Sequence, residues 1–346
     1  MASNKDSAWL SAWYGKRRWT LLLLPLTGLF CVLSGLRGHW LKRRQQRLAV
    51  PVVVVGNISV GGTGKTPLLI ALTRHLQAQG YRPGIISRGY GARPPAYPFL
   101  VEPESPVAEA GDEPLAIARE TGAPVAIDPD RVAAGRALIA QGCTLLLSDD
   151  GLQHYRLARQ LEIAVVDGQR LLGNGWRLPV GPLREPAERL NQVDLVVLNS
   201  PQAGALAALS LRCPQARIQP MQIVPGQWRR VSDDTPLALE EWRPANAVDA
   251  IAGIGNPARF FDTLTQLGLP IKAHAFADHQ TYSAENLAFV RGRALVMTAK
   301  DAVKCRALAR QWGEQEWYYL AVSAEPHACF WEAFDAKIAA LNPRRA

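Results

Sequence analysis

Short apolar runs alternate with helical patterns along the chain from residue 48 to residue 224. The run VVVVG at 52–56 comes first, and a glycine-rich loop separates it from the helical pattern PLLIALTRHLQAQ, which Gly80 ends. Five more apolar runs follow in this region: GIIS, PVAI, TLLLS, LEIAVV and DLVVLN. Strands that are apolar throughout are buried on both faces, so the pattern predicts an α/β fold with a parallel sheet covered by helices on each side.

A second unit begins after the stretch 225–244, which is marked by prolines and tryptophans. Its first segment, VDAIAGIGNPARFFDTLTQLG, reads as a strand, a glycine turn and a helix, and further strand-and-helix patterns follow. The sequence therefore predicts a larger α/β domain at 48–224 and a smaller α/β domain at 225–346 with a C-terminal helix.

The formal charge of +9 is concentrated at the N-terminus. Residues 1–47 hold nine basic side chains, from Lys5 and Lys16 to Arg47, against the single acid Asp6, so they carry +8 of that charge. Because the rest of the chain is nearly neutral, this distribution argues against nucleic acid as a partner. It indicates instead that the basic N-terminal segment has a function of its own. Nothing in the sequence indicates an obligate protein partner.

The basic residues flank an uncharged apolar run of 18 residues, Trp19 to Leu36. A helix that spans a bilayer takes about 20 residues, so this run is near the lower limit, and Pro25 and Gly28 favour a shallow insertion. Tryptophans lie on both sides of the run, and the basic flanks suit an anionic membrane surface. A signal peptide and a buried core helix are the alternatives, although no A-x-A-like cleavage site follows. We predict a membrane-anchoring segment at 1–47, and leave open whether the run spans the bilayer.

The loop after the first strand contains most of a phosphate-binding motif. It matches G-x-x-x-x-G-K-[ST] except that Ser59 stands where the first glycine is expected. The predicted ATP-binding residues are Ser59, Val60, Gly61, Gly62, Thr63, Gly64, Lys65 and Thr66. Because a strand precedes the loop and a helix follows it, backbone N–H groups are expected to face phosphates, with Lys65 at the β- and γ-phosphates and Thr66 on Mg²⁺.

Two further motifs bear on the class of P-loop protein. Partition-type ATPases carry a lysine where this chain has Val60, and GTPases carry N-K-x-D where it has VVLNSPQ, so both classes fit poorly. A P-loop ATPase needs an acidic residue for its metal at the end of a neighbouring strand. TLLLSDDG supplies Asp149 and Asp150 there, although adjacent aspartates also occur in solvated turns.

Two weaker signals remain. GIGNPA at 253–258 matches the dinucleotide form G-x-G-x-x-[GA], with Asp278 about 20 residues further on, but a tight turn between a strand and a helix explains the same glycines. The five cysteines lack the spacing of a zinc site or a disulfide framework and fit a reducing cytoplasm.

Nine segments taken together resemble one family, the tetraacyldisaccharide 4′-kinases (lipid A 4′-kinases) of Gram-negative bacteria. They occur in the family's order between Val55 and Lys304: VGNISVGGTGKTP, SRGYG, GDEP, DPDRV, DDGLQH, GPLREP, AGIGNPARFF, FADHQTY and TAKDAVK. Serine at position 59 is characteristic of that family. The resemblance implies a P-loop NTPase-like domain with a second, smaller α/β domain and an N-terminal membrane-associated helix.

The resemblance also implies an activity. The protein would use ATP and Mg²⁺ to phosphorylate the 4′-hydroxyl of tetraacyldisaccharide 1-phosphate, a lipid A precursor. The reaction would take place at the cytoplasmic face of the inner membrane. The family's pattern points to Asp112 of GDEP as the base, paired with His279 of FADHQTY. From the residues alone, Asp112 reads equally as a helix N-cap and His279 as a loop residue.

Other positions follow from the resemblance in the same way. Arg88, Tyr90 and Arg131 are expected on the lipid-substrate side, where arginine suits the 1-phosphate, although each arginine alone reads as a surface ion pair. Arg184 and Glu185 of GPLREP are further active-site candidates. The predicted metal ligands are Thr66, Asp149, Asp150 and Glu185, with Gln153 and His154 beside them.

Two other functions remain as alternatives to a lipid kinase. One is a membrane-targeted ATPase switch without a lipid acceptor. The other is a soluble small-molecule kinase with an accessory anchor.

Overall fold

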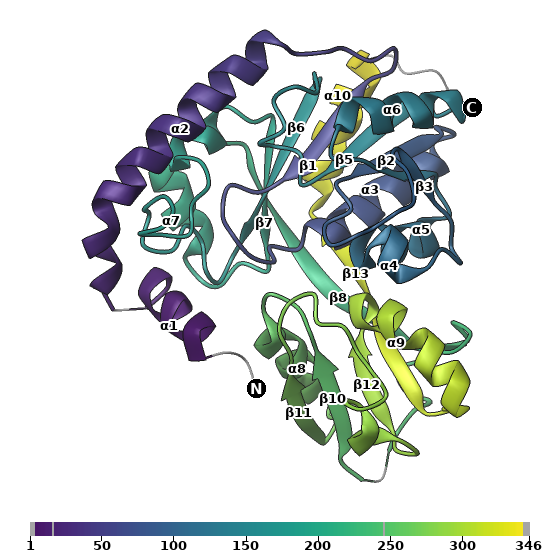
Figure 1. Cartoon of the computed structure of the whole chain (residues 1–346). Coiled ribbons are helices and arrows are strands. Elements are labelled where there is room, and N and C mark those ends of the chain that lie inside the picture. The colour runs from purple at the N-terminus through teal and green to yellow at the C-terminus, as the bar shows by residue number, and fades with distance from the viewer. Residues whose placement is uncertain (1–3, 16, 245, 342–346) are drawn as a thin grey trace.

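One continuous sheet of 13 strands runs through the computed structural model, which describes residues 4–15, 17–244 and 246–341 (Figure 1). Its larger part is parallel and has the order β8 (Ile218–Arg230), β7 (Leu195–Asn199), β6 (Leu161–Asp167), β1 (Val52–Gly56), β5 (Leu145–Asp149), β2 (Pro83–Ser87) and β4 (Val125–Ile127). The edge strand β3 (Phe99–Val101) pairs antiparallel with β4. Every residue of β1, β2, β5 and β7 is buried, as expected for apolar strands covered on both faces.

The smaller part of the sheet begins where β13 (Trp317–Pro326) pairs antiparallel with β8. From β13 the sheet continues in parallel through β12 (Leu295–Thr298), β10 (Val248–Ala252) and β11 (Ile271–Ala275), while β9 (Pro236–Leu237) pairs with β8. In Figure 1 the long strands β8 and β13 join an upper lobe to a lower lobe. The two lobes therefore share one sheet.

Helices cover both faces of each lobe. On the larger part of the sheet, one face carries α3 (Lys65–Ala78), α5 (Asp112–Thr121) and α10 (Ala328–Leu341), and the other carries α6 (Arg131–Ala140) and α7 (Ala205–Arg212). In the smaller lobe, α9 (Ala299–Trp312) and α8 (Pro257–Gln266) contribute to separate apolar clusters. The short helices are α4 (Val107–Ala110), η2 (Ala187–Asn191) and η3 (Ala288–Val290).

The last helix, α10, lies with the first lobe. Phe330, Phe334 and Ile338 are fully buried in the same cluster as Leu68 and Leu72 of α3. Burying a phenylalanine of this kind contributes about 1.5–3 kcal/mol, so α10 ties the end of the chain to the nucleotide-loop side of the sheet. The domain limits 48–224 and 225–346 stay a prediction.

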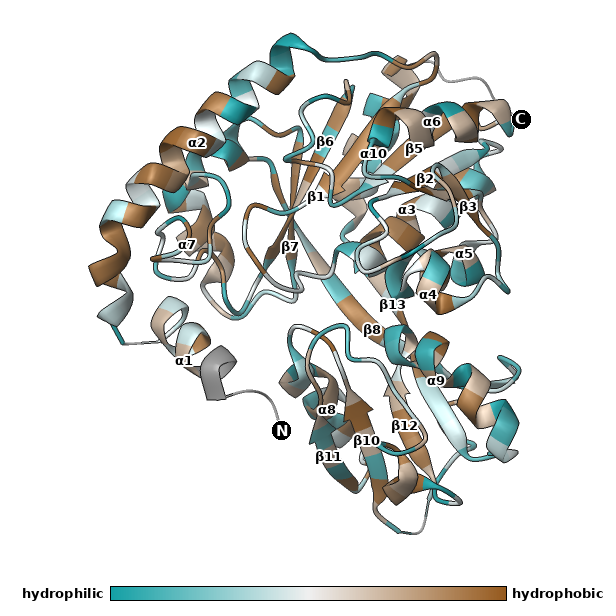
Figure 2. Cartoon of the chain, in the orientation of Figure 1, coloured by the Kyte–Doolittle hydropathy of each residue, from teal (hydrophilic) through white to brown (hydrophobic). Residues whose placement is uncertain are grey.

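The N-terminal segment lies along the first lobe (Figure 1), and many of its large apolar side chains are exposed. It consists of α1 (Asn4–Trp13), η1 (Trp19–Leu23) and α2 (Leu24–Arg43), while Lys16 lies outside the described residues. On α2, Thr27 Oγ1 accepts from the Val180 amide at 3.3 Å, and Ser34 Oγ accepts from Arg177 at 2.6 Å. Figure 2 shows hydrophobic residues along α2. Within the described residues, Trp19–Arg43 is the one helical stretch long and apolar enough to cross a membrane.

Candidate active site

The predicted phosphate loop connects β1 to α3. Lys65 is the first residue of α3, and Gly64 before it has φ +92°, a left-handed conformation that favours glycine. The side-chain amide of Asn57 reaches across the loop to the Gly61 carbonyl at 3.3 Å, and Asn199 Nδ2 donates to the Thr63 carbonyl at 2.9 Å. These contacts hold the loop open at the N-terminus of a 14-residue helix, the arrangement that binds phosphate.

Ser59 replaces a motif glycine without backbone strain. Its φ lies outside the positive range, so a side chain is allowed there. The residue is buried and forms an isolated bridge with Leu183, and the amide of the next residue, Val60, donates to the Pro182 carbonyl at 2.9 Å. The segment GPLREP therefore braces the loop where the first glycine is missing.

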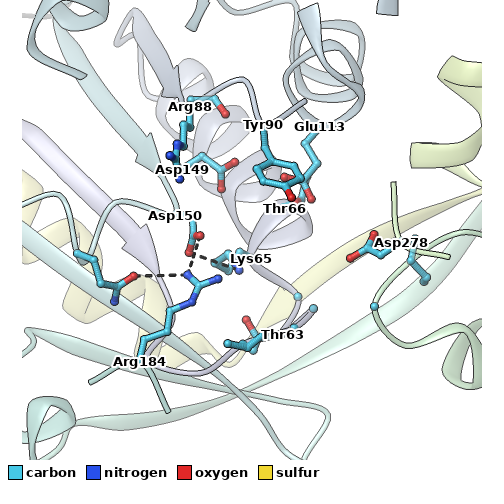
Figure 3. A pocket seen from close by; sticks show the side chains of 18 of the residues that line it. Thr63, Lys65, Thr66, Arg88, Tyr90, Glu113, Asp149, Asp150, Arg184 and Asp278 are labelled. Atoms are coloured by element: carbon cyan, nitrogen blue, oxygen red, sulfur yellow. Dashed lines mark hydrogen bonds and ion pairs between the residues drawn. The ribbon is translucent and has the colours of Figure 1, made fainter. Parts of the chain in front are cut away.

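The two predicted metal aspartates lie beside the loop. Asp149 is the last residue of β5 and pairs in register with Val55 of β1. Asp150 follows it, with Oδ1 3.6 Å from Lys65 Nζ and Oδ2 2.9 Å from Arg184 Nη1 (Figure 3). The lysine of the loop and the arginine of GPLREP thus meet at the carboxylate of Asp150, next to Asp149.

The two aspartates have opposite pKa shifts. Burial raises the pKa of Asp149 to about 7, and the negative charges of Glu113 and Asp150 add to that effect. Burial acts in the same direction on Asp150, but Lys65 and Arg184 outweigh it and lower the pKa of Asp150 to about 2. A carboxylate desolvated like Asp149 is stabilised by a nearby cation, so its surroundings fit a metal ligand.

Glu185 lies in the same region but has other partners. Its Oε1 accepts from Gln153 Nε2 at 2.6 Å, its Oε2 accepts from the Tyr155 hydroxyl, and Arg189 Nε is 3.4 Å from Oε2. Both oxygens of this buried carboxylate are therefore engaged. His154, the other predicted neighbour of the metal site, has its pKa lowered to about 3 by burial and nearby arginines, so it is neutral.

The predicted catalytic base Asp112 and its partner His279 come from different lobes and contact each other. Asp112 begins α5 and is buried, and His279 Nδ1 lies 3.1 Å from its Oδ2 and 3.2 Å from its Oδ1. Burial acts to raise the pKa of Asp112, but the hydrogen bond with His279 and the charge of Lys300 outweigh it and lower that pKa. His279 has φ +59°, a strained conformation for a non-glycine residue.

Two lysines of TAKDAVK lie beside this pair, and neither was among the predicted site residues. Lys300 Nζ lies 3.8 Å and Lys304 Nζ lies 3.9 Å from Asp112 Oδ2. The sequence signal that could have identified them is their spacing of four residues, which places both side chains on the same face of a helix. Read alone, that spacing also fits a solvated helix face.

The three predicted substrate positions line one cavity with the phosphate loop. Arg131 begins α6 and is buried, with Nη1 donating to the Ile86 carbonyl at 3.2 Å, and burial lowers its pKa to about 10. Arg88 is exposed, and the exposed ring of Tyr90 lies 4.9 Å from the His279 ring.

This cavity has a volume of about 1530 Å³ and is lined by both lobes and by α2. Phe30 and Leu33 of α2 line it together with Lys65 and Asp149 on the first lobe and His279 on the second. Figure 3 shows the charged side chains pointing into the shared space. An apolar helix and a phosphate-binding loop therefore border the same cavity.

The glycine turn of GIGNPA faces the phosphate loop. A Cβ on Gly255 would lie 3.0 Å from the Gly62 amide nitrogen, so the two backbones approach closely. Asp278, the acid expected to bind a ribose in a dinucleotide site, has Oδ1 3.0 Å from Lys300 Nζ. The close approach of the Gly255 and Gly62 backbones therefore explains the glycine at position 255 without a bound dinucleotide.

The fold and the site define a class: a strand, phosphate loop and helix with strand-end aspartates beside them belong to the P-loop nucleotide-dependent enzymes. Comparison with known proteins gives the family, since the model described as Tetraacyldisaccharide-1-P 4'-kinase matches residues 19–339. The chain belongs to that family of kinases.

Individual relatives agree with this assignment. Tetraacyldisaccharide 4'-kinase of Ectopseudomonas mendocina is 48% identical over 338 residues, which cover 96% of this chain and 97% of that protein. The Pseudomonas aeruginosa protein of the same name is 47% identical over 339 residues, covering 97% of this chain and 98% of its own. The crystal structure of LpxK from Aquifex aeolicus in complex with ATP has a TM-score of 0.75 and 25% identity, and covers 93% of this chain and 99% of that chain. The predicted family, kinase class and P-loop α/β fold are confirmed.

Proposed function

We propose that this chain transfers the γ-phosphoryl group of ATP to the 4′-hydroxyl of a tetraacyldisaccharide 1-phosphate, a lipid A precursor. One observation carries the proposal: the Asp112–His279 pair flanks the cavity that the phosphate loop borders, and α2 lines the same space. A base, a nucleotide loop and an apolar wall are what phosphorylation of a lipid hydroxyl requires.

In this proposal the residues divide the work of phosphoryl transfer. Ionised Asp112 accepts the proton of the incoming hydroxyl, and His279 orients that carboxylate through Nδ1. Lys65 and Arg184 neutralise charge on the phosphate oxygens, from the positions where they meet Asp150.

Mg²⁺ is part of the proposal. When bound with ATP it would supply positive charge between the phosphate oxygens. Thr66 and the two strand-end aspartates are the residues that would hold it, because Mg²⁺ in phosphate sites takes only one or two carboxylates. Glu185 fits less well, since donors already occupy both its oxygens.

The acceptor is proposed to enter from a membrane. Arg88, Tyr90 and Arg131 line the cavity where the lipid 1-phosphate and sugar would lie, and Arg131 offers a planar donor set for phosphate. The apolar outer face of α2 and the N-terminal basic residues would hold the chain on an anionic surface, which we assign to the cytoplasmic face of the inner membrane of a Gram-negative cell.

The test uses purified full-length protein in detergent with γ-labelled ATP and tetraacyldisaccharide 1-phosphate. Label transferred to the lipid supports the proposal. ATP consumption that is the same with and without the lipid, with no label in it, would instead indicate an ATPase switch. Equal activity on a water-soluble acceptor after removal of residues 1–47 would indicate a soluble kinase.

A further inference from the structure

Lys300 is the residue at which charged groups of both lobes converge. It lies in the first turn of α9, lines the cavity, and its side chain is only 16% exposed. Its Nζ is 3.2 Å from Glu113 Oε1 and 3.8 Å from Asp112 Oδ2 on the first lobe, and 3.0 Å from Asp278 Oδ1 on the second. A single ammonium therefore bridges three carboxylates from two lobes.

The same ammonium also faces the imidazole. Lys300 Nζ lies 3.4 Å from His279 Nε2, while His279 Nδ1 faces Asp112. An ammonium has only donors, so it pairs well with Nε2 as an acceptor and opposes a proton on that nitrogen. This contact selects the neutral tautomer with its hydrogen on Nδ1, which then donates to Asp112.

We propose that Lys300 is a positioning residue for phosphoryl transfer, which fixes His279 as the Nδ1–H tautomer and keeps Asp112 ionised beside it. The inference rests on the proposed function, because it takes Asp112 as the base. It also accounts for the strained backbone of His279, since the ion pair with Asp278 anchors the residue next to it.

The other charged groups around Asp112 and His279 determine in which direction their pKa values change when Lys300 is removed. Glu113 and Asp278 add negative charge, while Lys304 lies 3.9 Å from Asp112 but is itself paired with Asp301 at 2.9 Å. Removing Lys300 leaves the carboxylates without their nearest shared cation. Without that positive charge, Asp112 and His279 bind protons more readily, so the pKa values of both rise.

The experiment measures kcat and kcat/KM against pH for the wild-type full chain and for Lys300→Met, with ATP and tetraacyldisaccharide 1-phosphate in detergent. We expect kcat at neutral pH to fall about 10- to 100-fold. We also expect the acid limb of the kcat/KM profile to move up by about one pH unit, with partial recovery at high pH. The KM for ATP should change less than kcat, because Lys300 does not belong to the phosphate loop.

Two other variants make the outcome decisive. Lys300→Arg keeps the charge and should retain the wild-type acid limb even if its kcat is lower. Lys337 lies on α10, outside the cavity, and Lys337→Met removes its ion pair of 2.7 Å with Asp194, so it should leave the profile unchanged. If the wild type phosphorylates the lipid but Lys300→Met loses activity equally at every pH, or not at all, the inference is wrong. A wild type that does not label the lipid overturns the proposed function instead.

Discussion

Asn199 Nδ2 lies where a side chain on Gly64 would have to go: a Cβ built on Gly64 would be 2.3 Å from that nitrogen. The same nitrogen donates to the Thr63 carbonyl at 2.9 Å. Asn199, at the end of β7, therefore supports the phosphate loop through this hydrogen bond, and the contact is possible only while position 64 has no side chain.

Gly64→Ala is expected to weaken ATP binding by about tenfold or more. The left-handed φ costs a non-glycine residue about 1–2 kcal/mol, and the clash with Asn199 adds to that cost. Calorimetric titration with ATP measures the effect. Gly80→Ala is the matched control, because Gly80 has φ +81° at the other end of α3 with open space around its Cβ position. Equal affinity in the two variants would contradict the prediction.

Asp112→Asn is expected to lower kcat by about 10²- to 10⁴-fold while ATP binding changes little. The amide cannot accept the proton of the hydroxyl, whereas the phosphate loop lies on a different element and is untouched. Steady-state kinetics with the lipid acceptor, together with ATP titration, separate the two effects.

A second His–Asp pair supplies the control for that variant. His75 Nε2 lies 2.7 Å from Asp335 Oδ1, and neither residue lines the cavity. Asp335→Asn removes a pair of the same chemistry and should keep kcat near the wild-type value. Near-normal turnover in Asp112→Asn would mean that another group is the base.

Local pattern was enough to predict the sheet and the phosphate loop. Continuous apolar runs such as 52–56 have one structural explanation, and the spacing of Gly64, Lys65 and Thr66 is set by phosphate geometry. The continuity of the sheet across both lobes was not predictable in this way. It depends on β8 pairing with β13, and β8 has a mixed burial pattern because it lies between the lobes.

Contacts between distant segments were also beyond the residue pattern. Asp112 and His279 are separated by 167 positions, and only the resemblance to a family brought them together. Lys300 was missed because its partners come from separate segments, and a lysine on a helix most often faces solvent. The tolerance for Ser59 depends on a φ value that the sequence does not contain.

The pKa of His279 is expected to lie above 6.5 and to fall in Asp112→Asn. The hydrogen bond with Asp112 raises the pKa of His279 and outweighs burial, which acts to lower it. A raised pKa contributes stability that is fully present below the unfolded value of about 6.5 and is lost as pH rises through the folded value. NMR titration of the imidazole measures the pKa directly. His279→Gln should therefore reduce the free energy of unfolding more at pH 5.5 than at pH 9, and an equal loss at both would contradict the assignment.

The outer face of α2 is expected to drive membrane binding. Leu29, Val32 and Leu36 are 55%, 59% and 64% exposed and lie on one face at helical spacing. Each such side chain contributes about 1.5–3 kcal/mol when it leaves water, so replacing all three with glutamine should reduce binding by several orders of magnitude. The measurement is sedimentation with vesicles containing anionic lipid, at low and at high salt, since basic residues nearby add an attraction that salt screens. Leu211→Gln is the control, because Leu211 is 85% exposed on α7 and should leave binding unchanged. Undiminished binding of the triple variant would show that another surface holds the membrane.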